Sequence, residues 1–599
     1  MRRLFVFLSL VTVLLIASCS GPSVDDSGPT ILQLFVPSDG PNSMDPAQGA
    51  TMYDNTCVSQ VYETLLQDKY LKRPLELEPL LLAEMPTTPD DGLTYHFKLK
   101  QDVRFQDDPC FPDGVGRKMV AADVIYSWKR LADSDVSLKN WWLLEKTIKG
   151  LDAHRDAFTA AKKADRAAKF DYDAPIEGME IINDHEFKIT LTEKVQRFLW
   201  TLAMFQMSIL PREAVEKYGI KFGRHPVGTG PFKMAEDGWI PQKSMSLTRN
   251  PNYHECYYPS EWMPEDEALG LHKAAGQRIP FVDGVEVTFF TQDQPLWLSF
   301  RAGKLDFSRV PKDNFGEAFN KRTKKLKPSF RKEGIVDHAV PQLDFIYYGF
   351  NMEDELLGGY TDEKRALRQA ISLALDWEER NDIFYNNVCQ IYDGMIPPGL
   401  NGYPQGGEGP VSYRGPDLER ARELLAKAGY PGGEGLPTID YYTSIEGPGK
   451  EMAEMTMKQL RKIGINLNPR LDVFSAFDEK LKNRKCGFFS LAWHSDYPDA
   501  ENNLALFYSR NKSPGANNFI YDNPEFDKLY EQIRSMPKSD DRTKIIERMR
   551  DMVLEDAPFC GSLARTRYYL VNPWLKNCKP SEDFQNWWKY LDLDESRRR

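Results

Sequence analysis

Alternation of apolar and polar residues marks two short segments of the chain as half-buried β-strands. Every second side chain is apolar in these segments, which is the period of a strand with one face packed on a core. Each segment follows a turn dipeptide, Asp91-Gly92 in one case and Asn183-Asp184 in the other. We therefore predict strands in which the buried residues are Leu93, Tyr95, Phe97 and Leu99, and Phe187, Ile189 and Leu191.

A helical period occurs in two further segments, and each begins at a residue that can cap a helix. Thr361 precedes Asp362 and Glu363 in the first segment, and Asp417 opens the second. Gly429 lies where the second helix should stop. The chain therefore mixes helices and strands. The two apolar faces consist of Leu367, Ala370, Ile371 and Ala374, and of Ala421, Leu424, Leu425 and Ala428.

Two charged stretches, 150–172 and 254–278, show no strong period of either kind. Segments that cannot bury an apolar face are expected on the surface, so we predict that both stretches are surface insertions. No internal repeat is visible in the sequence.

The first thirty residues have the organisation of an export signal. Arg2 and Arg3 precede an apolar run over 4–16, which is too short to span a bilayer as a helix. The run ends in Ala17-Ser18-Cys19, which resembles a bacterial lipobox, so we predict a lipoprotein signal peptide over 1–18 and lipidation of Cys19. An ordinary secretory signal with an incidental cysteine is the alternative. Residues 19–30 are expected to form a flexible tether.

Composition narrows the class of protein and its partners. The 599 residues include 88 acidic and 77 basic ones, and 41% are hydrophobic. This acidic balance lacks the basic surface that nucleic acid requires, so we expect no nucleic-acid partner. An acidic body is not drawn to an anionic membrane either, so attachment would depend on the lipid.

The sequence offers little chemistry for catalysis or for metal binding. The eight histidines form no HExxH pair, and neither a GxSxG turn nor a phosphate-binding GxxxxGK[ST] loop is present. The seven cysteines after Cys19 contain no CxxC pair, although an exported protein could form up to three disulfides. We predict no catalytic residues, no metal site and no cofactor.

A series of motifs over residues 43–527 carries the most specific signal. The motifs include SMDP at 43–46, QVYETLL at 60–66, PVGTGPF at 226–232, RNPNY at 249–253, FN at 350–351, RQA at 368–370, ALD at 374–376, KIGI at 462–465, WHSDYPD at 493–499 and NPEFD at 523–527. In this order and spacing they resemble the motifs of family-5 extracellular solute-binding proteins of ABC importers, a group that includes oligopeptide-, dipeptide- and nickel-binding proteins.

The resemblance implies an α/β fold, namely a two-lobed periplasmic-binding-protein-like clamp of type II, cluster C, with an extra inserted domain. Lobe I would combine 31–67, 205–344 and 568–599. The inserted domain II would cover 68–204, and lobe III would cover 345–567. The two crossings between the lobes would act as a hinge that closes over a ligand. The stretch 254–278 departs from the family pattern, and it could remodel the rim of the cleft or leave it unchanged.

The resemblance also implies candidate ligand-binding residues. Trp493-His494-Ser495-Asp496 matches a stretch of the peptide-binding members in which an acidic residue pairs with the α-amino group of the peptide. Asp496 would hold that ammonium, Trp493 would wall a side-chain pocket, and the backbone at His494 would pair with an extended ligand. By looser alignment, Met52 would line the opposite wall and Tyr347 the hinge face. The alternatives are a helix cap or turn role for Asp496 and a core position for Trp493.

Together these features predict a lipid-anchored solute-binding protein that acts as a monomer outside the cytoplasm, on the periplasmic side or at the cell surface. It would capture peptides and deliver them to an ABC-type permease. One alternative keeps the fold but binds a sugar, a metal chelate, an opine-like compound or a signalling compound. An exported hydrolase is the remote alternative. The sequence does not indicate which residue would pair with a ligand carboxylate.

Overall fold

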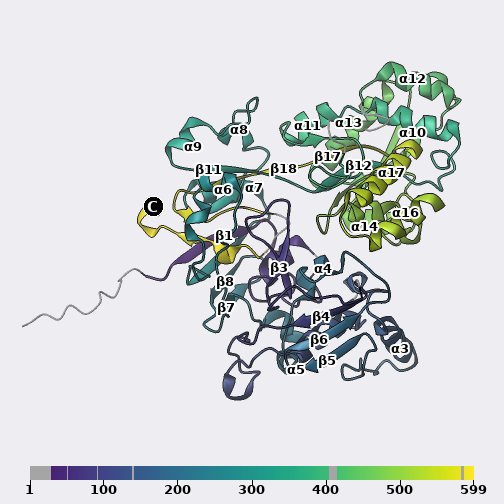
Figure 1. Cartoon of the computed structure of the whole chain (residues 1–599). Coiled ribbons are helices and arrows are strands. Elements are labelled where there is room, and N and C mark those ends of the chain that lie inside the picture. The colour runs from purple at the N-terminus through teal and green to yellow at the C-terminus, as the bar shows by residue number, and fades with distance from the viewer. Residues whose placement is uncertain are drawn as a thin grey trace, which may run out of the picture.

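The computed structural model describes residues 28–49, 51–90, 92–137, 140–403, 415–581 and 586–598. The predicted signal peptide, Cys19 and most of the tether lie outside these residues. The chain forms three bodies, each built on its own β-sheets (Figure 1). No helix in the described part of the chain is long and apolar enough to cross a membrane.

The first body contains the start of the chain, its middle and its end, and we call it lobe I. Two larger sheets form it, together with the two-stranded sheet of β19 (Leu575–Lys576) and β20 (Asp592–Leu593). The four-stranded sheet has the order β1 (Ile31–Val36), β9 (Gly284–Phe289), β8 (Ser244–Arg249), β7 (Phe232–Ile240), and the three-stranded sheet has the order β10 (Phe307–Arg309), β18 (Thr566–Val571), β11 (Val336–Pro341). Its helices include α1 (Met52–Val58), α6 (Pro264–Ala268), α7 (Asp293–Arg301), α8 (Phe315–Ala318) and α9 (Pro328–Lys332), whereas α5 (Arg212–Tyr218) lies beside β5 and β6 of the next body in Figure 1.

Domain II lies below lobe I in Figure 1, and the two share one continuous hydrophobic core. A three-stranded antiparallel sheet forms its centre, and a small hairpin lies at its entry. The strands are β4 (Thr94–Lys98), β6 (Glu186–Thr190) and β5 (Met179–Asn183), with β2 (Leu66–Asp68) and β3 (Leu77–Pro79) in the hairpin. The helices are α2 (Ala121–Ala132), α3 (Leu151–Ala164) and α4 (Phe198–Thr201).

Lobe III is built on a six-stranded sheet with helices on both faces. The sheet has the order β13 (Gln390–Ile391), β17 (Phe559–Ala564), β12 (Asp344–Phe350), β16 (Phe488–His494), β14 (Ile439–Ser444), β15 (Leu467–Asp472). One face packs against α10 (Asp362–Ala374), α11 (Trp377–Tyr385), α12 (Leu418–Lys427) and α13 (Gly449–Arg461). The other packs against α14 (Phe474–Lys482), α15 (Ala500–Leu504), α16 (Pro524–Ser535) and α17 (Asp540–Asp556).

The central strand β12 shows why this sheet needs helices on both sides. Every residue of β12 is buried. Ile346 and Tyr348 point into one hydrophobic cluster, whereas Phe345 and Tyr347 point into the other. A strand that is covered on both faces carries a continuous apolar run instead of alternation.

The locally encoded predictions are confirmed. The two alternating segments form β4 and β6, which pair with each other through Phe97 and Phe187. Thr361 and Asp417 cap α10 and α12, because each side-chain oxygen accepts a backbone N–H in the first helical turn. Gly429 follows the end of α12 with φ +93°, a left-handed conformation that favours glycine.

The two charged stretches differ from each other. Residues 151–164 form the helix α3, in which only Leu151 and Phe158 are buried, so this stretch lies on the surface as predicted. The stretch 254–278 is partly internal, which corrects its prediction as a surface insertion. Asp266 is fully buried there and binds Lys579 Nζ at 2.7 Å, because a carboxylate inside the protein needs a cationic partner.

The cysteines of the described chain form no disulfide, so the permitted bridges are not made. All seven cysteines after Cys19 are free thiols, and most of them are buried. Burial raises the pKa of the Cys57 thiol and of the Cys560 thiol well above the ordinary value, which keeps both protonated and unreactive.

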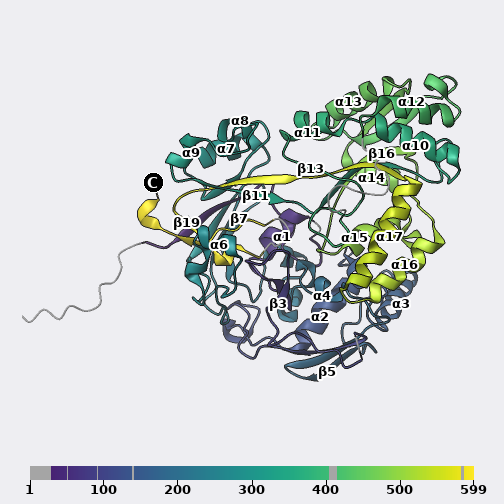
Figure 2. The same ribbon diagram turned by 45° about the horizontal axis from the view of Figure 1, so that its top comes forward.

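The chain crosses between lobe I and lobe III twice, and the second crossing leads into the yellow strand that runs between the lobes in Figure 2. The outgoing crossing joins β11 to β12, and the returning crossing joins β17 to β18. β11 lies antiparallel to β18, and β12 lies antiparallel to β17. At the junction, the N–H of Gln342 donates to the carbonyl of Arg565. Lobe III is therefore connected to lobe I by two short antiparallel segments of chain. The residue numbers at which the three bodies meet stay a prediction.

An ion pair ties the two crossings together. The carboxylate of Asp344, at the start of β12, is fully buried and accepts from Arg565 Nε at 2.5 Å and from Arg565 Nη2 at 3.0 Å. His494 Nδ1 lies 3.1 Å from the same carboxylate. Burial alone would raise the pKa of Asp344, but the hydrogen bonds from His494 and Arg565 outweigh it and hold the pKa well below the usual range.

We predict that Asp344→Asn lowers the free energy of unfolding by about 2–4 kcal/mol, because Arg565 and His494 lose a buried partner. The native pKa is lowered, so the stabilisation is complete above the ordinary value of 3.8 and is lost as the pH falls through the native pKa. Urea unfolding at neutral and acidic pH should show the difference shrinking in acid. Asp541→Asn, on the exposed first turn of α17, is the control. Equal stability of the Asp344 variant and the wild type at neutral pH would contradict the hinge assignment.

Candidate ligand-binding site

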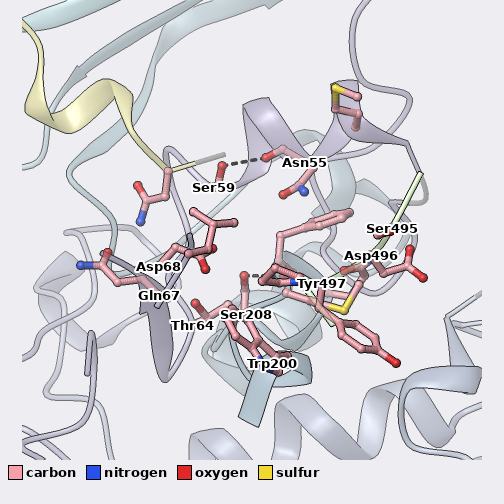
Figure 3. A pocket seen from close by; sticks show the side chains of 18 of the residues that line it. Asn55, Ser59, Thr64, Gln67, Asp68, Trp200, Ser208, Ser495, Asp496 and Tyr497 are labelled. Carbon is pink, nitrogen blue, oxygen red and sulfur yellow. Dashed lines mark hydrogen bonds between the residues drawn. The ribbon is translucent and has the colours of Figure 1, made fainter. Parts of the chain in front are cut away.

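Two adjoining cavities lie where lobe III meets lobe I and domain II. Cavity A has a volume of about 320 Å³ and cavity B of about 1040 Å³. Cavity A is lined by segments of 51–75 and 200–208 on one side and by Leu343 and 494–498 on the other (Figure 3). Asp496, Tyr497, Met204 and Gln206 line both cavities. The two cavities therefore form one cleft with walls from all three bodies.

Asp496 lies at the junction of the two cavities, two residues beyond the end of β16. Its side chain is exposed to the cleft, and Asn502 Nδ2 donates to its Oδ2 at 2.9 Å. Desolvation raises the pKa of Asp496 above the ordinary value, while Asn502, His494 and Arg197 oppose this shift. A carboxylate in this setting is stabilised by a cation that enters the cleft. The helix cap of α15 is Asp499, so Asp496 is free of the cap role.

Trp493 and His494 flank the cleft from the last residues of β16. Trp493 is half-buried, lines cavity B and donates from Nε1 to Asn502 Oδ1 at 2.8 Å. His494 lines cavity A and contacts Asp344 of the hinge. Asn502, which is 5% exposed on α15, thus orients both Trp493 and Asp496. No sequence motif points to Asn502, because its role depends on contacts with residues nine and six positions before it.

Met52 and Tyr347 are placed differently. Met52 is the first residue of α1 and lines cavity A, opposite the segment 494–498. Tyr347 is 1% exposed, and its ring packs against Phe345 and Phe519 inside lobe III. It lines neither cavity A nor cavity B. The structure therefore brings Met52, Trp493, His494 and Asp496 together around the cleft but leaves Tyr347 in the core.

Within the part of the chain that the structure describes, the strand that leads to Asp496 has a free edge near the cleft. β16 pairs with β12 along its whole length, but it pairs with β14 only at Phe488 and Phe489. The N–H of Ser495 donates to the carbonyl of Leu343 on the β12 side. Backbone groups alternate in an antiparallel pair, so the peptide group of the exposed Ala492 faces the other side, beyond the end of β14. This edge can accept an extended chain as an added strand.

Cavity B carries most of the charged side chains of the cleft. Its cationic residues outnumber its acidic ones. Some cations form ion pairs with acidic residues of the lining, such as Arg534 with Glu193 at 2.9 Å. Behind its wall, Glu501 is 3% exposed and accepts hydrogen bonds from the hydroxyls of Tyr497 and Tyr530. The cations that line cavity B are Lys146, Lys194, Arg197, Lys482, Arg510 and Arg534, and the acids are Glu145, Glu193, Asp496 and Glu531.

Comparison with known proteins identifies the family. The model of the bacterial extracellular solute-binding proteins, family 5 Middle, matches residues 76–515. The chain belongs to this family. Among curated family-5 relatives, the oligopeptide-binding protein OppA of Bacillus subtilis is 22% identical over 96% of this chain and 95% of its own length. The heme-binding protein A of Haemophilus influenzae is 24% identical over 87% of this chain and 85% of its own length.

Solved structures of similar proteins show the same two-lobed fold. The DppA periplasmic binding protein of Helicobacter pylori, in complex with the peptide STSA, has a TM-score of 0.68 and 21% identity over 94% of this chain and 98% of its own. AppA of Bacillus subtilis, in complex with a nonapeptide, has a TM-score of 0.68 and 19% identity over 95% of this chain and 100% of its own. The α/β clamp predicted from the sequence is therefore confirmed.

We predict that Asp496→Asn makes the ligand-free protein more stable at neutral pH, by less than about 1 kcal/mol because cavity solvent screens the charge. The native pKa of Asp496 is raised, so the ionised form costs stability above that pKa. Below the ordinary value of 3.8 both states are protonated and the difference should vanish. Urea unfolding of both proteins across this range measures the difference. A variant that is less stable at neutral pH would contradict the desolvated setting of Asp496.

Proposed function

We propose that this protein captures peptides in the cleft between its lobes and delivers them to an ABC-type permease. The observation that carries the proposal is the position of Asp496 beside the free edge of β16. A peptide needs two things from a general binding site, a counter-charge for its amino terminus and partners for its backbone. Asp496 supplies the first, and the peptide groups near Ala492 supply the second.

The cavities suit a ligand of variable sequence. Cavity B is large, and its charged side chains come from opposite lobes, so water can fill the space around different side chains. Several of its cations could receive a ligand carboxylate, and no single one is favoured. We therefore propose tolerance of side chains, with recognition concentrated on the ligand backbone and its amino terminus.

Closure would follow from contacts that span the cleft. The N–H of Gln196 in domain II donates to the carbonyl of Arg534 in lobe III at 3.0 Å, and Glu193 pairs with the Arg534 side chain. A ligand held by both walls adds to these contacts, so it favours the closed arrangement over the open one. The hinge at Asp344 and Arg565 would absorb the movement.

A second candidate function, binding of a non-peptide solute, rests on the range of similar proteins. These include the heme-binding protein A already described and MoaA of A. tumefaciens R10 in complex with mannopinic acid, with a TM-score of 0.64 and 18% identity over 92% of this chain and 95% of its own. The fold therefore accommodates several ligand classes. A ligand without an amino group would leave Asp496 without its proposed role. We propose no enzymatic activity.

The test of peptide binding uses Asp496→Asn and peptides with free or acetylated amino termini. The wild type should prefer the free amine, and the variant should lose about 2–5 kcal/mol of affinity for it, because the ammonium loses its charged partner. Isothermal titration measures both. Asp541→Asn, with the same change on an exposed site, should bind like the wild type.

The acetylated peptide separates the proposed mechanism from general damage. It should bind the wild type and Asp496→Asn equally weakly, since neither forms the ammonium pair. Equal binding of free and acetylated peptides by the wild type would overturn the amine-anchor role. Native mass spectrometry of the purified protein, with identification of the released molecule, then tells a peptide from another solute.

We also propose that Cys19 carries a lipid and holds the mature protein, as a monomer, on the outer side of a membrane. In a bacterial host, full-length protein should incorporate labelled fatty acid and fractionate with membranes. Cys19→Ala should abolish both results, because the thiol that takes the lipid is gone, while the acidic body alone has little affinity for an anionic surface. Membrane association that persists in Cys19→Ala would contradict the anchor.

A further inference from the structure

Cavity A is lined by several carboxylates, and the basic side chain on its described wall is that of His494. No lysine or arginine occurs among the described residues that line it, whereas Glu63, Asp68 and Asp496 do. Glu63 is 1% exposed and pairs with His254 Nε2 at 3.0 Å. Asp68 and Asp496 lie on opposite sides of the cavity in Figure 3. The cavity thus presents a carboxylate at each of two separate places.

The hydroxyl groups of the lining add further acceptors. Each of six hydroxyls donates its single proton to another protein group, so it can only accept a hydrogen bond from a ligand. Ser59 and Ser208, for example, donate to the carbonyls of Asn55 and Phe205. The six hydroxyls belong to Thr51, Ser59, Thr64, Ser208, Ser495 and Tyr497.

Two amide oxygens at this cavity have no hydrogen-bond partner in the described part of the chain. Gln206 is 9% exposed, and its Oε1 is buried without a donor; the same holds for Asn55 Oδ1. Both residues line cavity A. A buried acceptor without a donor is costly, so a ligand that brings several N–H groups is favoured here.

The rest of the wall suits a long aliphatic chain. Trp200, Met204 and Leu75 also line the cavity. Its volume of about 320 Å³ equals that of about ten water molecules, which leaves room for an extended side chain. Lysine and arginine combine such an apolar stem with a donor-rich cationic head.

We propose that cavity A is a specificity pocket for a basic side chain, carried by the ligand residue whose amino group Asp496 holds. Asp68 is the counter-charge for the side chain, and Gln206 and Asn55 are further acceptors. This inference rests on the proposed peptide-binding function and adds the class of the first ligand residue. The preference would distinguish this protein from a binder that is indifferent to side chains.

The test compares two tripeptides that differ only in the terminal charge of the first side chain, Lys-Ala-Ala and norleucine-Ala-Ala. The wild type should bind the lysine peptide at least tenfold more tightly in isothermal titration, because only its ammonium can pair with Asp68. Asp68→Asn should remove most of this preference while the norleucine peptide binds as before. Asp541→Asn should keep the wild-type preference.

The outcomes separate the two proposals. Equal binding of both tripeptides by the wild type overturns the basic pocket and leaves peptide binding intact, and this comparison needs no variant. Binding of neither tripeptide, nor of their pentapeptide extensions, overturns the peptide function and the pocket together. If Asp68→Asn weakens both peptides equally, Asp68 is not the counter-charge. Gln206→Leu should weaken the lysine peptide more than the norleucine peptide, and the reverse order counts against the pocket.

Discussion

The carboxylate of Asp344 is the constraint on which the geometry of the clamp depends. It receives hydrogen bonds from Arg565 on the returning crossing and from His494 at the end of β16. Three segments that are distant in the sequence therefore meet at one buried charge, which is stable only while its partners stay in place. The two crossings and the wall of cavity A therefore share one buried charge.

The cleft is electrostatically asymmetric, and the asymmetry arises from few residues. Cavity A has acidic groups and acceptors, whereas cavity B contains most of the cations. Asn502 fixes the boundary, because it holds Asp496 on one side and Trp493 on the other. Under the proposed function, such a cleft would give an extended zwitterionic ligand a preferred direction, with its positive end in cavity A.

Local features of the fold could be predicted from the sequence, but contacts between distant segments could not. The strands β4 and β6 and the caps Thr361 and Asp417 depend on neighbouring residues, and the sequence alone located them. Their positions required no knowledge of the tertiary fold. By contrast, Asp266 is charged, and its segment shows no strong hydrophobic periodicity. Its partner Lys579 lies more than three hundred residues away, so the neighbouring sequence could not predict that Asp266 is buried.

The candidate site likewise combines residues that a local motif predicts with features that depend on the tertiary fold. The motif at 493–496 led to Trp493, His494 and Asp496, which do line the cleft. Tyr347 was assigned to the ligand site by looser alignment. It lies on β12, which is covered by helices on both faces, so side chains on either face of this strand enter a hydrophobic core. A position near the hinge therefore does not bring Tyr347 to the ligand. The acceptor character of cavity A was invisible in the sequence, because it depends on where each hydroxyl proton is already used.

The place of β18 in lobe I has a consequence for the order in which the protein can fold. β18 is the middle strand of the sheet β10-β18-β11, yet it is formed by residues 566–571, close to the end of the chain. During synthesis from the amino terminus, β10 and β11 emerge long before the strand that joins them. The three-stranded sheet of lobe I thus stays incomplete until residues 566–571 are available, and the sheet of lobe III likewise waits for β17 at residues 559–564, so neither lobe can finish all of its sheets before the last tenth of the chain is present.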